Sequence, residues 1–344
     1  MDETGEKADV INANAEVTPM LEEAAVFCPA KCIAISKDPD QTTDQGMNHQ
    51  QLTKIFEVGA TSEPLDEIMS LVALIQPSFK PDRLRQLHDD VARLFTGTYP
   101  GFQTSTTRYH NLKHTISVAL ASARLLHGLH CSGQDITSHT LELALYSAYI
   151  HDIGLLTETS DKVVSGAIYI NNHEERSIVF LKKYLAGSNV SQLFIQECAS
   201  VIECTNIALT PQDIAFPSAE SEMAGYIVGS ADILAQMADR YYLERLPFLF
   251  QELKEGGVEN RESPIGLIQD TTRFYHDIII GRLEKSLSNV AQAMGIHFQK
   301  RWQINENLYY TNIEKNINYL KKILKICEDE LDNLGTFLKR IPPP

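Results

Sequence analysis

Apolar side chains recur at helical spacing along most of the chain from Leu65 onward. Between residues 65 and 94 they fall every three or four positions, which predicts two helices separated near Pro81. The stretch from Leu141 to Ile150 is apolar on all sides, which is typical of a buried, central helix. No stretch alternates as a half-buried strand does, so the pattern predicts an all-α fold. Further helices are expected over residues 117–129, 174–185, 193–202, 224–250 and 271–293.

The C-terminal segment carries a heptad pattern. Its apolar residues alternate at spacings of four and three from Ile313 to Leu338, as in the seam of a coiled coil. Two interpretations remain open. The segment is either one amphipathic helix that packs on its own domain, or the seam of a homodimer through 313–338.

The pattern divides the chain into three parts. Residues 1–60 are rich in Asp, Glu, Asn, Thr and Gln, and their lack of periodicity predicts an acidic, partly ordered N-terminal extension. A helical domain is expected over 61–300, followed by the heptad-patterned helix over 301–344.

Composition narrows the class of protein. The chain has 344 residues and a formal net charge of −15, with 43% hydrophobic residues, which is ordinary for a globular protein. The acidic balance argues against a nucleic-acid surface, which would need clustered Lys and Arg. No apolar run is long enough to span a membrane, and the first residues lack the features of a signal peptide, so we expect a cytoplasmic protein. The cysteines, including Cys28 and Cys32, form no framework pattern.

Histidines and acids supply the candidate chemistry. Three His-Asp pairs occur, and only His151-Asp152 follows the predicted buried helix. A carboxylate there would carry a large desolvation penalty unless it were paired or bound to a cation. A metal ion would satisfy both residues. The other two pairs, on stretches expected to face solvent, are His88-Asp89 and His276-Asp277.

Two further blocks could contribute to the same site. His110 and His114 are four residues apart, so on a helix they would share one face. Asp232 is a single acid among small and apolar residues, near the start of a predicted helix. A helix-capping role is the alternative interpretation for this aspartate.

The order of these blocks resembles the HD-domain superfamily of metal-dependent phosphohydrolases, over roughly residues 105–285. The blocks are Tyr-His-Asn-x-x-His at 109–114, His-Asp at 151–152 and Ala-Asp at 231–232. Asn-His at 172–173, Cys-Thr-Asn at 204–206 and the Tyr-Leu-Glu after Asp232 make the chain similar to the catalytic domain of class I cyclic-nucleotide phosphodiesterases. The resemblance implies an HD-domain, phosphodiesterase-like helical bundle.

Matched position by position, the resemblance implies one divalent metal ion, with the second ion left open. Mixed imidazole and carboxylate ligands suit Zn, Mn, Fe, Co or Ni, and a second site would suit Mg or Mn. Asp152 would bridge toward the second ion, and His110 would be the catalytic general acid. The implied metal ligands are His114, His151, Asp152 and Asp232, and the outer positions are Tyr109, Asn111, His173, Thr205, Asn206 and Gln236.

Three departures from the phosphodiesterase pattern limit what it implies. Leu155 stands where the family has another histidine, and Asn206 stands where it has an aspartate. Both weaken the second metal site. The family's base-clamping block most nearly matches 263–268, where Pro264 and Leu267 replace a glutamine and an aromatic residue. Proline cannot hydrogen-bond a purine edge, so cyclic-purine specificity is not expected.

The sequence therefore predicts a metal-dependent phosphohydrolase or phosphodiesterase that acts on a small, nucleotide-like phosphate mono- or diester. The alternative is a catalytically weak regulatory module that binds a metal or nucleotide and signals through a helical dimer seam. A purely structural scaffold would have to treat the ordered polar set as accidental.

Overall fold

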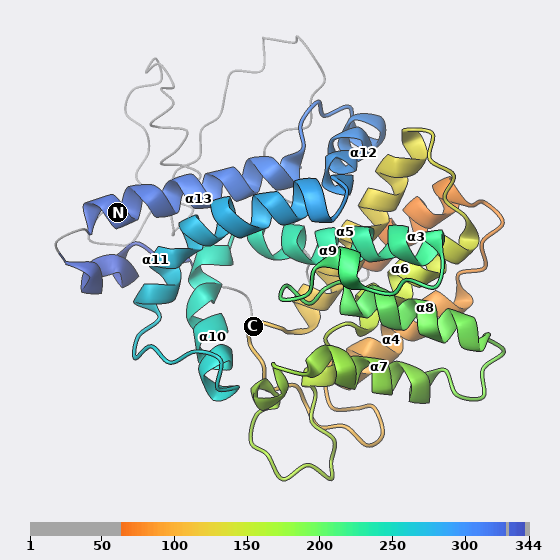
Figure 1. Ribbon diagram of the computed structural model, residues 1–344, viewed down its shortest axis with the longest axis horizontal. Helices are drawn as coiled ribbons and strands as arrows, with labels where there is room; N and C mark the ends of the chain where they lie inside the picture. Colours follow the sequence, from red (N-terminus) through yellow and green to blue (C-terminus); the bar gives the residue numbers. More distant parts are fainter. Residues whose placement is uncertain (1–62, 328–329, 341–344) are drawn as a thin grey trace, which may run out of the picture.

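The structure is a computed structural model that describes residues 63–327 and 330–340, and it is all-α, as the sequence predicts. The predicted extension 1–60, with Cys28 and Cys32, lies outside the described residues. Within them no strand forms, and the extended pairings are two isolated bridges, Thr96 with Thr104 and Phe102 with Glu158. No helix in this part is both long and apolar enough to cross a membrane. The α-helices (Figure 1) are α3 (Glu63–Ile75), α4 (Asp82–Phe95), α5 (Leu112–Cys131), α6 (Ser138–Ile150), α7 (His173–Tyr184), α8 (Gln192–Glu203), α9 (Ala219–Met237), α10 (Tyr242–Glu255), α11 (Ile265–Phe274), α12 (Ala293–Trp302) and α13 (Leu308–Ile326).

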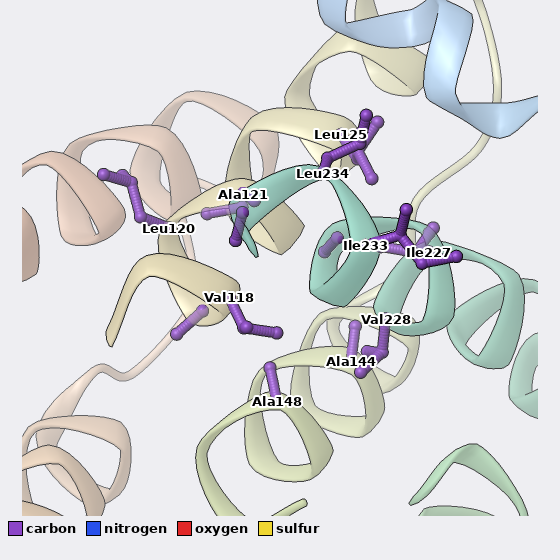
Figure 2. Close-up of a cluster of buried hydrophobic side chains, with 14 of the residues drawn as sticks. Val118, Leu120, Ala121, Leu125, Ala144, Ala148, Ile227, Val228, Ile233 and Leu234 are labelled. Atoms are coloured by element: carbon purple, nitrogen blue, oxygen red, sulfur yellow. The ribbon is translucent and has the colours of Figure 1, made fainter. Parts of the chain in front are cut away.

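Three helices, α5, α6 and α9, form the centre of the core. Small and branched apolar side chains from all three interlock (Figure 2), and Leu125, Ala144 and Ile227 are each fully buried. Helix α6 packs on α4, α5, α8 and α9. This explains its lack of a polar face, and it confirms the prediction of a central helix. The candidate ligands lie on or directly after these three helices, so the best-packed part of the fold positions them.

The helix predicted over 224–250 is in fact two helices. Helix α9 begins earlier than expected, at Ala219, and ends at Met237. The Asp239 carboxylate then accepts the amide N–H of Tyr241 at 2.9 Å, in the turn that precedes α10. A short aspartate side chain that binds the backbone two residues ahead favours a turn over a continuous helix.

The helical pattern over 271–293 is also interrupted. Helix α11 passes into two π-helical segments, Tyr275–Ile279 and Arg282–Ser286. Ser288 and Asn289 then adopt left-handed backbone conformations with φ of 50° and 56°, which end the helical run before α12.

Most of the C-terminal heptad positions are buried within the chain's own fold, and Leu324, Leu331 and Leu338 are half-buried. Ile313, Ile317 and Leu320 on α13 are at most 2% exposed. Helix α13 packs on α9, α11 and α12. The predicted long helix ends at Ile326, and residues Leu331–Thr336 form a 3-10 helix instead. This arrangement matches the interpretation in which the segment packs on its own domain. The homodimer through 313–338 stays a prediction.

Candidate metal centre

Three of the predicted ligands meet in the interior of the fold. His114, His151 and Asp152 offer donor atoms that all lie within 4.8 Å of one another, and all three residues are buried. Asp152 Oδ2 is 3.3 Å from the Nε2 atoms of both histidines. The two Nε2 atoms are 3.4 Å apart. Donor atoms that share a metal ion with bonds near 2.1 Å are separated by roughly 3.0–3.4 Å, so this trio could hold a metal ion.

The ends of two helices place these residues. His114 is in the first turn of α5, where the Asn111 side chain caps the helix by accepting the His114 amide N–H at 3.1 Å. His110 precedes this cap, so His110 and His114 do not share a helix face as the spacing had suggested. His151 caps the C-terminus of the buried helix α6, and Asp152 follows it.

Asp232 approaches the trio from α9. It lies in the interior of that helix, which Ser218 caps, so both its expected place near a helix start and the capping alternative are wrong. Its Oδ1 is 3.2 Å from His114 Nε2 and 3.8 Å from His151 Nε2. The fourth predicted ligand therefore contacts the two histidines, although it stands outside the compact trio.

The polar atoms of the trio are those that a cation would satisfy. The His151 Nδ1–H donates to the Ala148 carbonyl at 2.8 Å, so Nε2 is the nitrogen that faces Asp152. Asp152 Oδ2 is buried and accepts no hydrogen bond from any described residue. A buried, ionised carboxylate is costly unless a positive charge lies close to it, as a protonated His151 or a metal ion would. The residues present therefore fit a metal ion.

The charges of the protein groups also favour a cation at this place. Burial would lower the pKa of His151, but the charges of Asp152 and Asp232 and the Ala148 carbonyl raise this pKa to about 9. Burial opposes ionisation of Asp152, yet its contacts with His151 and His114 hold the pKa of Asp152 well below the usual range. Burial acts to raise the pKa of Asp232, but the contacts with His114 and His151 outweigh burial and lower this pKa. A proton on His151 thus occupies the place that a metal ion would take.

Glu252 holds His110 beside the trio, and the sequence reasoning missed it. His110 Nδ1 donates to Glu252 Oε2 at 2.7 Å, and Glu252 Oε1 accepts the amide N–H groups of Arg108 and Tyr109 at 2.6 Å. Burial acts to lower the pKa of His110, but Glu252, Asp152 and Asp232 together raise it. No spacing could have linked these residues, since 142 positions separate His110 from Glu252.

A second network orders Tyr109 and Asp232. The Tyr109 hydroxyl donates to Gln236 Oε1 at 3.0 Å, and Gln236 Nε2 donates to Asp232 Oδ1 at 2.7 Å. The Arg245 guanidinium donates to the Tyr109 carbonyl and pairs with Asp239 at 3.1 Å. Both predicted outer residues, Tyr109 and Gln236, therefore lie where they can orient a ligand.

His173 faces the other oxygen of Asp152. Its Nε2 is 3.6 Å from Asp152 Oδ1, and its Nδ1 is 2.8 Å from the Ile170 carbonyl. Gly154 allows this approach, because a Cβ atom there would lie 1.9 Å from the His173 carbonyl oxygen. The Ser177 hydroxyl joins the two segments, since it accepts the Gly154 N–H and donates to the His151 carbonyl.

Thr205 and Asn206 take part in local structure instead. Thr205 donates to the Ile202 carbonyl, and Asn206 accepts the Ala208 N–H in a turn. The buried Arg282 guanidinium holds this turn through the carbonyls of Cys204 and Asn206, both at 2.9 Å. None of these hydrogen bonds links Thr205 or Asn206 to the trio.

One known protein family matches most of the described chain. A family model described as Npun_R2479-like matches residues 99–316. The chain belongs to this Npun_R2479-like family. The matched range contains the trio, Asp232 and the His110–Glu252 pair, so the whole candidate centre lies within the family domain. A comparison with curated proteins finds no match.

Proposed function

We propose that the protein is a metal-dependent phosphohydrolase that cleaves a phosphate mono- or diester, with a nucleotide-like molecule as the substrate class. The observation that carries the proposal is the buried trio His114, His151 and Asp152, in which Asp152 Oδ2 lies 3.3 Å from the Nε2 atoms of both histidines. The ordered blocks shared with HD-domain phosphohydrolases support the same chemistry.

The chain's residues divide into a metal-holding set and a proton-donating pair. His114, His151, Asp152 and Asp232 would hold one divalent ion, and Asp152 Oδ1 with His173 Nε2 are the atoms that could help hold a second. A divalent ion supplies hydroxide near neutral pH and neutralises charge on phosphoryl oxygens. Zn, Mn, Fe, Co, Ni and Mg all remain candidates.

His110 fits the role of general acid. Its Nδ1 is bound to Glu252, so its Nε2 is the nitrogen available to a substrate. Since its neighbours raise the pKa of His110, the imidazole keeps its proton further toward alkaline pH than an ordinary histidine. In the reaction a water oxygen attacks phosphorus, the P–O bond to the leaving group breaks, and His110 gives its proton to the leaving oxygen.

The test is a hydrolysis screen with purified full-length protein. Mn, Mg, Ni and Co are each supplied with cyclic nucleotides, linear nucleotides and p-nitrophenyl esters, and Asp152→Ala is assayed beside the wild type. Turnover that requires a metal and disappears in Asp152→Ala supports the proposal. Absence of any turnover that depends on Asp152 overturns it.

A regulatory module is the second candidate, because Leu155 stands where the phosphodiesterase pattern has a histidine. Leu155 is 1% exposed and contributes no ligand to the second site. Such a module would bind a metal or nucleotide without hydrolysis. Inactivity with metal bound, together with a nucleotide-dependent change in mass by light scattering, would favour it over the enzyme. A dimer through 313–338 would give twice the mass of one chain in the same light-scattering experiment.

A further inference from the structure

The side chain of Arg108 stacks on an aromatic ring beside the His110–Glu252 pair. Its guanidinium carbon lies 3.8 Å from the centroid of the Phe248 ring, and the residue is exposed. Phe248 precedes Glu252 by four residues on α10, so their side chains are neighbours on one helix face. The guanidinium therefore lies about one helical turn from the carboxylate that holds His110.

Among the described residues, the guanidinium N–H groups of Arg108 have no hydrogen-bond partner, in contrast to those of Arg176. Arg176 stacks on Tyr169 at 3.5 Å, and it also donates to the carbonyls of Gly154 and Leu156 at 2.7 and 3.1 Å. Arg176 is thus a structural clamp. Over the described ranges, Arg108 has neither an ion pair nor a guanidinium hydrogen bond, and the contact with the Phe248 ring is the interaction that its guanidinium makes.

An unpaired, oriented guanidinium at this position is notable in a chain with a net charge of −15. Surface arginines of acidic proteins have carboxylates available to them, as Arg261 has with Glu259 and Asp270. Arg108 instead presents a planar fork of N–H donors, the geometry that binds phosphate in a bidentate manner. Stacking on Phe248 reduces the entropy that the side chain would lose on binding.

We propose that Arg108 recognises a second phosphate group of the substrate, one that is not hydrolysed. This inference rests on the proposed function, because it takes the trio as the place of the reacting phosphate. It narrows the substrate class to small molecules that carry two phosphate groups. Arg108 acts as a specificity residue, and it takes no part in proton transfer.

The experiment compares two probes that differ by one phosphate. Binding of adenosine 3′,5′-bisphosphate and adenosine 5′-monophosphate to the Mn-loaded full-length chain is measured by calorimetry. The wild type is expected to bind the bisphosphate at least about tenfold more tightly, as a charged hydrogen bond allows. Arg108→Gln should abolish this preference, and Arg108→Lys should restore part of it. Arg85→Gln, at an exposed position on α4, is the matched control and should leave the preference intact.

The outcomes separate this inference from the proposed function. A preference for the bisphosphate that is lost in Arg108→Gln supports the inference, whether or not either probe is hydrolysed. Absence of hydrolysis would count against the proposed hydrolase and not against the role of Arg108. Where hydrolysis occurs, Arg108→Gln should raise KM for the bisphosphate and leave kcat unchanged. No preference in the wild type, or an equal preference in Arg108→Gln, overturns the inference and leaves the hydrolase standing.

Discussion

The imidazole Nδ1 of His110 lies 2.7 Å from Glu252 Oε2, and this pair sits beside the buried trio. The contact fixes which nitrogen of His110 is free, and it helps to raise the pKa of the ring. The proposed acid catalysis therefore depends on a residue of α10 that is not itself a candidate metal ligand.

Removing the charge of Glu252 should shift the pH dependence of hydrolysis. The neighbours of His110 raise its pKa, so the acid form is present at low pH and is lost as pH rises through that pKa. In Glu252→Gln the amide oxygen can still accept the two backbone N–H groups, but the negative charge is gone. We expect the alkaline limb of the kcat profile to move to lower pH, with about a tenfold or greater loss of kcat at pH 8. Glu255→Gln, exposed at the end of α10, is the control. An unchanged profile would exclude His110 as the acid.

Metal binding should release a proton near neutral pH. In the metal-free chain the pKa of His151 is raised to about 9, so this ring is protonated at pH 7 and must lose its proton to become a ligand. Affinity for Mn should therefore rise with pH up to about 9. Calorimetry at pH 7 in buffers with different ionisation enthalpies should report about one proton released per ion. Zero release would mean that the metal does not displace a proton from His151.

Acid should destabilise the fold through a buried histidine pair remote from the metal centre. His127 on α5 and His297 on α12 place their Nδ1 atoms 3.2 Å apart, and burial, with Arg124 nearby, lowers the pKa of His297 to about 2. As pH falls below 6.5, the unfolded chain binds a proton at this histidine, whereas the folded chain does not. The free energy of unfolding therefore falls as pH drops below 6.5.

Urea unfolding at pH 7.5 and pH 5.0 checks this expectation. For His297 the loss at pH 5.0 should be about 2 kcal/mol of unfolding free energy. His297→Gln should unfold with a smaller difference between the two pH values, whatever its absolute stability. A wild-type stability that is equal at both pH values would contradict the assignment of a neutral, buried His297.

Gly154 should tolerate no side chain. A Cβ atom there would lie 1.9 Å from the His173 carbonyl oxygen, which is main chain and cannot rotate away. Gly154→Ala should cost about 1–3 kcal/mol in unfolding free energy and displace His173 from Asp152. Gly281→Ala is the matched control, because its Cβ would meet nothing within 4 Å. Equal stability of the two variants would show that the turn after Asp152 is looser than described.

Local patterns in the sequence predict the helices well but not their breaks. The apolar stretch Leu141–Ile150 is the buried helix α6, because periodicity and burial are properties of the segment itself. The break near Asp239 leaves no mark in the apolar pattern, because it lies in a turn in which the Asp239 carboxylate accepts the Tyr241 N–H. The end of α13 at Ile326 falls within an unbroken heptad pattern, so the pattern does not mark it.

The candidate site was predictable where short motifs carry it. The cost of burying an acid predicts His151 and Asp152, the resemblance to HD-domain phosphohydrolases adds His114, and the fold brings the three together. Glu252 could not be chosen, since its role depends on α10 lying against residues 108–110. Arg108 could not be predicted either, because its proposed role depends on its contact with the Phe248 ring.

Metal content is the most direct test of the central proposal. Protein purified without an affinity-tag metal is analysed for bound elements, before and after incubation with Mn or Zn, beside Asp152→Ala. Glu142→Gln, elsewhere on α6, controls for a general loss of charge. We expect at least about one divalent ion per wild-type chain, retained in Glu142→Gln and lost in Asp152→Ala. A wild-type chain that binds no metal, even after incubation, would contradict the metal centre and the hydrolysis built on it.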